Sequence, residues 1–365
     1  MASVHRAANI LEFIAGLILV VIVLDAAIRT FVLPRPAGVT LSRAVSRATR
    51  AVFDFVARFS KSFEGQDRVM ALYGPLTLLT FVVVWLLGVG AGYALMFHAS
   101  SDLGWRLALR ISGSSLLTLG FAVPVTRGSV ALVFSEAAIG LVLVALLIAY
   151  LPTMYSAFSH RESAVSQLTV RAGTPPAAAN LLIRAHKAGF TDKLDDVWQQ
   201  WELWFVETEE THTSLAMLNF FRSTNPQRSW LTSAGTVLDA AALRLSILNI
   251  PYSSHAAVCI RSGFVCLRSI ADFFQIPYDP EPAADDPISV THDEFMEVYE
   301  QLGGEGLPVK ADRERAWREY AGWRVNYDTV LVALAGLIMA PYAPWISDRS
   351  IGEKHHRPPL RQRRS

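Results

Sequence analysis

The chain has 365 residues, 52% of them hydrophobic, and a formal net charge of +1. A net charge this close to zero argues against the basic stripe that nucleic-acid binding requires, so we expect no nucleic-acid partner. The apolar residues gather in long runs before residue 160, which excludes an ordinary soluble globule and predicts an all-α membrane protein with a polar helical part after the runs.

The first apolar run covers residues 8–32, and we assign residues 1–33 to a first transmembrane helix. About 20 apolar residues suffice to span a bilayer. No small-residue cleavage site follows, which argues against a signal peptide. Asp25 and Arg29 lie four residues apart near the end of the run, a spacing that predicts an ion pair at the membrane border.

Residues 34–70 form a basic segment, which the distribution of arginine and lysine places in the cytoplasm. Apolar residues recur in it at helical spacing: Leu41, Val45, Ala48, Val52, Phe55, Val56 and Phe59. This pattern favours a basic helix lying in the membrane interface. The alternative is a helix packed on the cytosolic part of the chain.

Two further spans are predicted at residues 72–97 and 129–158. Gly88, Gly90 and Gly92 in the first of them would permit close helix contacts. With the basic segment inside, the amino terminus lies outside, and everything after residue 160 is cytoplasmic. This makes a multi-pass protein of the plasma membrane, in contact with lipid.

The segment between these spans, residues 101–127, is too short and too polar to cross the membrane twice. It has helical apolar spacing over residues 103–117, followed by a stretch that contains Thr118, Leu119 and Gly120. Irregular backbone at membrane depth needs a surrounding of protein or a water-filled cavity. The segment is therefore either an exposed outer loop or a re-entrant pore loop.

The sequence SGSSLLTLGF, followed by the apolar run EAAIGLVLVALLIAYL, resembles the pore domain of prokaryotic, actinobacterial-type potassium-channel family proteins over about residues 71–160. The resemblance implies one pore loop per chain, a homotetramer, potassium as the permeant ion and Gly140 as a gating hinge of the inner helix. It places the ion filter at Thr118, Leu119, Gly120, Phe121 and Ala122. Backbone carbonyls of such a filter replace the water shell of the ion.

Two positions depart from the family pattern. Ala122 stands where the family has a second filter glycine, and Val123 stands where an aspartate usually follows. Alternating backbone handedness suits glycine, so Gly120 fits the filter. We expect Ala122 to carry a left-handed backbone at a cost of roughly 1–2 kcal/mol.

Polar residues around the loop are candidates for bracing it. A carboxyl inside a membrane span marks a functional site, and Glu136 would brace the pore helix through Ser112, Ser114 or Ser115. The alternative is that Glu136 sets the electric field in the pore. Arg127 either faces the outer mouth, where it would repel cations, or extends towards lipid headgroups.

Residues 161–349 are expected to form an all-α cytosolic domain, and residues 350–365 a basic disordered tail. Helices are predicted over residues 193–222, 230–248, 256–274, 293–302 and 313–339. Thr291 and Glu294 form a capping-box pattern. The apolar run at residues 330–340 is too short to span, so it is a core helix or docks beneath the membrane.

No catalytic, cofactor or metal-ligand signature is present in the sequence, so we expect no enzyme, no cofactor and no metal site. In the run ETEETH (207–212) a solvated acidic face is favoured over a cation site. In NFFRSTNPQRSW (219–230) a helix-corner network is favoured over an anion site. Cys259 and Cys266, seven apart, are expected to be buried reduced thiols.

From these observations we expect the chain to form a tetrameric cation channel for potassium, with an atypical Thr-Leu-Gly-Phe-Ala filter. The cytosolic helices would regulate it, with an unidentified ligand as a further partner. The alternative is a non-conducting scaffold or membrane sensor that keeps the channel fold.

Overall fold

The computed structural model describes residues 2–33, 40–60, 62–101, 104–122 and 127–349. The chain divides into two compact units, Met1–Ser156 and Ala157–Ser365, which are described separately below. Throughout the described residues the secondary structure is helical, apart from an isolated antiparallel bridge between Leu248 and Val309. The all-α prediction is therefore confirmed.

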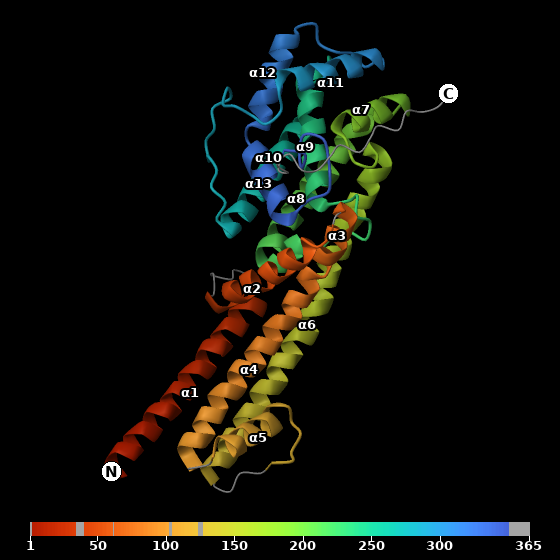
Figure 1. Cartoon of the computed structure of the whole chain (residues 1–365). Coiled ribbons are helices and arrows are strands. Elements are labelled where there is room, and N and C mark those ends of the chain that lie inside the picture. The colour runs from red at the N-terminus through yellow and green to blue at the C-terminus, as the bar shows by residue number, and fades with distance from the viewer. Residues whose placement is uncertain (1, 34–39, 61, 102–103, 123–126, 350–365) are drawn as a thin grey trace. The chain divides into compact units, whose positions relative to one another are not determined.

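The first unit is built from long helices together with the shorter helices α3 and α5 (Figure 1). Its elements are α1 (Ala2–Phe31), α2 (Thr40–Ala57), α3 (Phe63–Ala71), α4 (Tyr73–Ser101), α5 (Trp105–Leu116) and the first part of α6 (Arg127–Ala172). Within the described residues three helices are long and apolar enough to cross a membrane: Val4–Phe31, Phe63–Ser100 and Gly128–Ala172. They correspond to the three predicted spans.

Helices α1 and α4 pack closely because small residues lie where they meet. A Cβ atom added to Gly16 would lie 2.4 Å from the carbonyl oxygen of Gly92, and one added to Gly88 would lie 2.8 Å from Cγ2 of Val23. Small residues bring helix backbones together in this way in membranes, where packing replaces the hydrophobic effect. The expected role of the α4 glycines is thus confirmed.

The basic segment contains the expected amphipathic helix, α2. Val45 is buried in the unit, whereas Val52 and Phe55 on α2, and Phe59 just after it, are exposed. An exposed apolar row on a basic helix suits the membrane interface, which stays a prediction. The ion pair before this segment is present, with Arg29 Nε 2.8 Å from Asp25 Oδ1.

Helix α6 is longer than the sequence pattern predicted. It was expected to end near residue 158, but it runs through Pro152 to Ala172 and enters the second unit. Its later turns bury Val165 and Leu168 in the core of that unit, which keeps the chain helical past the end of the apolar run. Gly173, with φ +92°, then ends the helix in a conformation that glycine tolerates.

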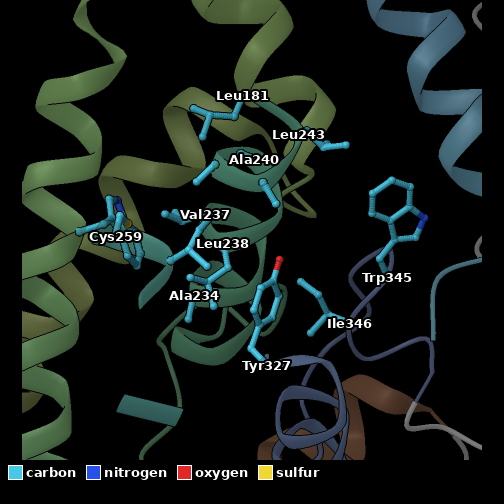
Figure 2. Close-up of a cluster of buried hydrophobic side chains, with 14 of the residues drawn as sticks. Leu181, Ala234, Val237, Leu238, Ala240, Leu243, Cys259, Tyr327, Trp345 and Ile346 are labelled. Atoms are coloured by element: carbon cyan, nitrogen blue, oxygen red, sulfur yellow. The ribbon is translucent and has the colours of Figure 1, made fainter. Parts of the chain in front are cut away.

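The second unit surrounds one central helix. Its elements after α6 are α7 (Ala178–Lys187), α8 (Leu194–Ser214), α9 (Trp230–Ile247), α10 (Ser254–Phe274), α11 (His292–Gly304), α12 (Arg313–Arg324) and α13 (Asp328–Ile338). Every residue of α9 is buried. Figure 2 shows side chains of α9, among them Val237 and Leu238, within the apolar core.

Two long helices predicted in this unit are interrupted, so those predictions were wrong. The helix expected over residues 193–222 ends at Ser214 and is followed by a short 3-10 helix, Ala216–Phe220. The helix expected over residues 313–339 divides into α12 and α13. In both places a buried polar network occupies the break, as described below.

Other features of the second unit agree with the sequence. The capping box of Thr291 and Glu294 is present at the start of α11. Helix α13 is a core helix, with Leu331 and Leu334 fully buried. The basic tail at residues 350–365 lies outside the described residues.

The thiols of Cys259 and Cys266 are free and buried in the second unit, as expected. Burial raises the pKa of both thiols, so little reactive thiolate forms in the folded chain. We expect a thiol-reactive dye to leave both cysteines unlabelled in the native protein and to label both after denaturation. Native labelling at the denatured rate, read by mass spectrometry, would contradict the buried positions.

Candidate functional site

Helix α5 holds the candidate pore loop between α4 and α6 of the first unit (Figure 1). Its buried face includes Ala108, Ile111 and Ser112, whereas Leu109 and Arg110 on the other face are exposed. The hydroxyl of Ser112 lies 2.9 Å from the carbonyl oxygen of Gly90 on α4. This face fixes α5 against α4.

The chain leaves α5 through a left-handed residue, Thr118, with φ +54°. The Leu119 N–H donates to the Ser114 carbonyl at 2.8 Å, and the Thr118 N–H donates to the Ser115 carbonyl at 2.9 Å. This pair of bonds is the Schellman arrangement, which ordinarily has glycine at the left-handed position. A β-branched residue there carries backbone strain, so Thr118 is an unusual choice.

Ser114 holds the rest of the loop. Its hydroxyl accepts a hydrogen bond from the Ala122 N–H at 3.1 Å. Gly120 has the expected positive φ, +72°, but Ala122 does not adopt a left-handed backbone. The prediction of a strained, left-handed backbone at Ala122 was therefore wrong. Thr118 has the left-handed backbone instead, because it ends α5.

Side chains of the loop are exposed in the single chain. Leu119 is 60% exposed and Phe121 58% exposed, and the guanidinium carbon of Arg110 lies 5.9 Å from the centre of the Phe121 ring. At membrane depth, an irregular backbone requires protein or a water-filled cavity around it. Val123 and the side chain of Arg127 lie outside the described residues.

Glu136 reaches α5 as predicted. It is fully buried on α6, and its Oε1 lies 2.5 Å from the hydroxyl oxygen of Ser112. The hydroxyl of Ser115 donates to the Val133 carbonyl on α6 at 2.8 Å. Glu136 thus contacts α5 through Ser112, whereas Ser115 bonds the α6 backbone and Ser114 holds Ala122.

Gly140 is also buried against α5. A Cβ atom added there would lie 2.2 Å from the carbonyl oxygen of Leu116, the last residue of α5. No side chain fits at that distance, so the position requires glycine for close packing. The sequence suggested a hinge at Gly140, and the structure supplies a second reason for glycine.

Sequence reasoning missed two partners of the loop scaffold. One is the Gly90 carbonyl, which lies beside Ser112. The other is the Tyr93 hydroxyl, which donates to Ser135 Oγ at 2.8 Å and joins α4 to α6. Backbone carbonyls leave no signal in a sequence. The second contact had a sequence signal, because Tyr93 lies in one predicted span and Ser135, next to Glu136, lies in the following one.

A second polar cluster surrounds Arg161, on the part of α6 that belongs to the second unit. Its side chain is 3% exposed and donates to the carbonyls of Leu218 at 2.9 Å and Phe221 at 2.8 Å. It also lies 3.1 Å from Nε2 of His212. Arg161 therefore ties the later part of α6 to the corner after α8.

The ETEETH residues are divided among tertiary contacts. Glu207 pairs with His160, Glu209 accepts from Ser269, and His212 lies against Arg161. The carboxylates thus serve separate partners and do not converge on one point. Among the described residues no group of three or more histidine, cysteine, aspartate or glutamate side chains could hold a metal ion.

The polar residues of 219–230 form the helix-corner network that the sequence favoured. Arg222 donates to the carbonyls of Ile338 and Met339 at the end of α13. The Asn219 amide donates to the His212 carbonyl at 2.9 Å, and Trp230 Nε1 donates to the Asn219 carbonyl. These bonds hold the break between α8 and α9.

His212 must be neutral in this network. Its Nδ1 faces the Thr208 carbonyl and its Nε2 faces the Arg161 guanidinium, so Nδ1 carries the hydrogen and Nε2 accepts. Burial and the charge of Arg161 lower the pKa of His212 well below its usual range. Protonation would place two positive charges together in the core.

We expect the folded chain to lose stability below about pH 6.5 because unfolded His212 then binds a proton that the folded form excludes. The loss approaches about 1.4 kcal/mol per pH unit. His212→Gln, which can still accept from Arg161, should flatten this slope. The free energy of unfolding, measured at about pH 7.5 and about pH 5.5, gives this slope.

His160→Gln, at an exposed position, serves as the control. An equal slope in wild type and His212→Gln would contradict the assignment.

A third network lies between α9, α12 and α13. Arg324 is fully buried and lies 2.6 Å from Asp239 Oδ2 and 2.7 Å from Asp328 Oδ1. The Tyr327 hydroxyl donates to Asp239 at 2.9 Å. Burial opposes the charge of Arg324, but the carboxylates of Asp239 and Asp328 raise its pKa well above the usual range.

A cavity of about 220 Å³ lies between the loop at residues 276–291, which follows α10, and the break before α13. Tyr278, Asp279, Asp286 and Tyr327 are among its lining residues. Both carboxylates accept backbone hydrogen bonds within the loop itself, from Glu281 and from Ala283. The cavity carries no assignment of a ligand.

No protein-family model matches the chain, and neither a curated protein nor a solved structure matches it.

Proposed function

We propose that four copies of this chain form a cation channel, with potassium as the permeant ion, in the plasma membrane. The observation that carries the proposal is the geometry of α5 and its loop. A short helix lies between two apolar helices, and its end is turned back so that residues 118–122 stay beside it. Each chain supplies one such loop, so a closed pore needs several copies around one axis.

Electrostatics at this end favours a cation. The carboxyl end of a helix carries a partial negative charge, and the loop adds backbone carbonyls close to it. Thr118 contributes a hydroxyl, and Gly120 permits the left-handed backbone. Leu119, Gly120 and Phe121, which are exposed in one chain, would be covered by the neighbouring copies.

The second unit is proposed to be cytoplasmic and to regulate the pore through α6. That helix continues from the first unit into the second, and Arg161 anchors its later turns to the α8 corner. A rearrangement of the second unit would therefore act on the same helix that contacts the loop at Glu136 and Gly140. The chain would act without enzymatic activity and without a cofactor.

Ion flux through proteoliposomes that hold the full chain tests the proposal. Thr118→Gly keeps the left-handed turn and removes the hydroxyl, whereas Thr118→Ser keeps the hydroxyl. We expect wild type to pass potassium faster than sodium, Thr118→Ser to resemble it, and Thr118→Gly to lose selectivity. Gly120→Ala, which cannot easily keep φ +72°, should abolish flux.

A non-conducting scaffold is the second candidate, favoured by Ala122, which stands where the family has a second filter glycine and is not left-handed, and by the use of Thr118 as a helix end. Absence of flux for either ion at varied pH, voltage and lipid composition would support it. Flux that is equal for both ions but still sensitive to Gly120→Ala would indicate a pore without selectivity.

A further inference from the structure

The carboxyl of Glu136 is held in an unusual setting for an acidic group. The residue is fully buried on α6, within a helix long and apolar enough to span the membrane. One oxygen, Oε1, contacts Ser112, and the other, Oε2, is buried without a hydrogen-bond partner among the described residues. An ionised carboxylate normally collects several donors, whereas Ser112 is the single hydrogen-bond partner recorded for this carboxyl among the described residues.

The hydroxyl groups nearby have only one hydrogen each. Ser112 Oγ lies 2.9 Å from the Gly90 carbonyl and 2.5 Å from Glu136 Oε1. If Ser112 donates to Gly90, its oxygen can only accept from Glu136, and an ionised Glu136 has no hydrogen to give. The hydrogen of Ser115 is already directed to the Val133 carbonyl at 2.8 Å.

Among the described residues no counter-charge compensates a negative Glu136. Its polar neighbours are the hydroxyls of Ser112 and Ser115, and no charged side chain of the described residues acts on it. From α4 the facing titratable group is Tyr93, whose hydroxyl donates to Ser135 and not to the carboxyl. The arginines of α5, at 106 and 110, are exposed. A buried, unpaired carboxylate is strongly disfavoured against its neutral acid.

We propose that Glu136 is a neutral carboxylic acid that donates its hydrogen to Ser112, while Ser112 donates to the Gly90 carbonyl. The two bonds form a continuous bridge from α6 through α5 to α4. The bridge enters α5 one turn before Leu116, the residue that contacts Gly140. Glu136 is thus a positioning residue that sets where α5, and with it residues 118–122, lies.

Infrared spectroscopy of the reconstituted full chain tests the protonation state directly. The wild-type minus Glu136→Gln difference at neutral pH should contain the carbonyl stretch of a protonated acid, shifted when Ser112→Ala removes the acceptor. Glu64→Gln, at an exposed carboxyl of α3, is the matched control, and its difference spectrum should lack this carbonyl band. An ionised carboxylate in the Glu136→Gln difference would overturn the proposal.

A rescue series tests the bridge. Glu136→Gln keeps a donor for Ser112 and should retain the wild-type thermal midpoint, whereas Glu136→Ala and Ser112→Ala should each lower it. The double change should cost little more than either single change, because both remove the same bridge. Additive losses, or a loss in Glu136→Gln as large as in Glu136→Ala, would overturn the bridge.

Only the effect on flux depends on the proposed channel function. If wild type conducts, Glu136→Gln should retain the potassium preference and Glu136→Ala should lose it. If wild type does not conduct, the channel proposal fails, while the infrared and midpoint results still decide the protonation state and the bridge.

Discussion

Replacing Arg324 by methionine is expected to destabilise the second unit by about 3–5 kcal/mol, the largest effect of any single change considered. The change removes the guanidinium that lies between Asp239 and Asp328 and leaves two carboxylates in the core. Removing one member of a buried ion pair costs more than the pair itself contributes, because the remaining charge is unpaired. Chemical unfolding followed by tryptophan fluorescence measures the loss, with Trp198 and Trp201 as buried reporters.

Two controls separate the lost charge from the lost side chain. Arg313→Ala breaks an ion pair with Glu300 that is more than half exposed, so its cost should stay within about 1 kcal/mol. Adding Asp239→Asn to Arg324→Met removes one of the stranded charges and should recover part of the stability. A loss below about 1 kcal/mol for Arg324→Met alone would contradict the buried network.

Gly140→Ala is expected to destabilise the first unit by roughly 1–3 kcal/mol and to displace the loop that follows α5. The new methyl group would fall 2.2 Å from the Leu116 carbonyl oxygen, so α5 and α6 must move apart. Thermal unfolding in detergent measures the stability, and ion flux measures the loop. We expect both to fall together, because the displaced element carries residues 118–122.

Gly128→Ala is the matched control on the same helix. A Cβ atom there meets no atom of the described residues within 4 Å, so alanine should be neutral or slightly stabilising, by up to about 1 kcal/mol. Gly140→Ala with wild-type stability but changed opening would favour the hinge role over the packing role.

Some features of this protein follow from the sequence alone because they depend on neighbouring residues. The three apolar runs determine three helices long enough to span, since length and composition decide that property. The capping box of Thr291 and Glu294 and the ion pair of Asp25 and Arg29 follow from spacings of three and four residues. The position of α5 between two spans follows from the order of the runs.

Other features were decided by contacts between residues far apart in the chain. The break between α12 and α13 brings Tyr327 and Asp328 to a network with Asp239, which lies 85 positions from Arg324. The backbone of Thr118 is left-handed because it ends α5. Gly140 is required by a carbonyl of another helix. Local patterns contain no information about such partners, because close packing and buried hydrogen bonds are specified only when the helices meet.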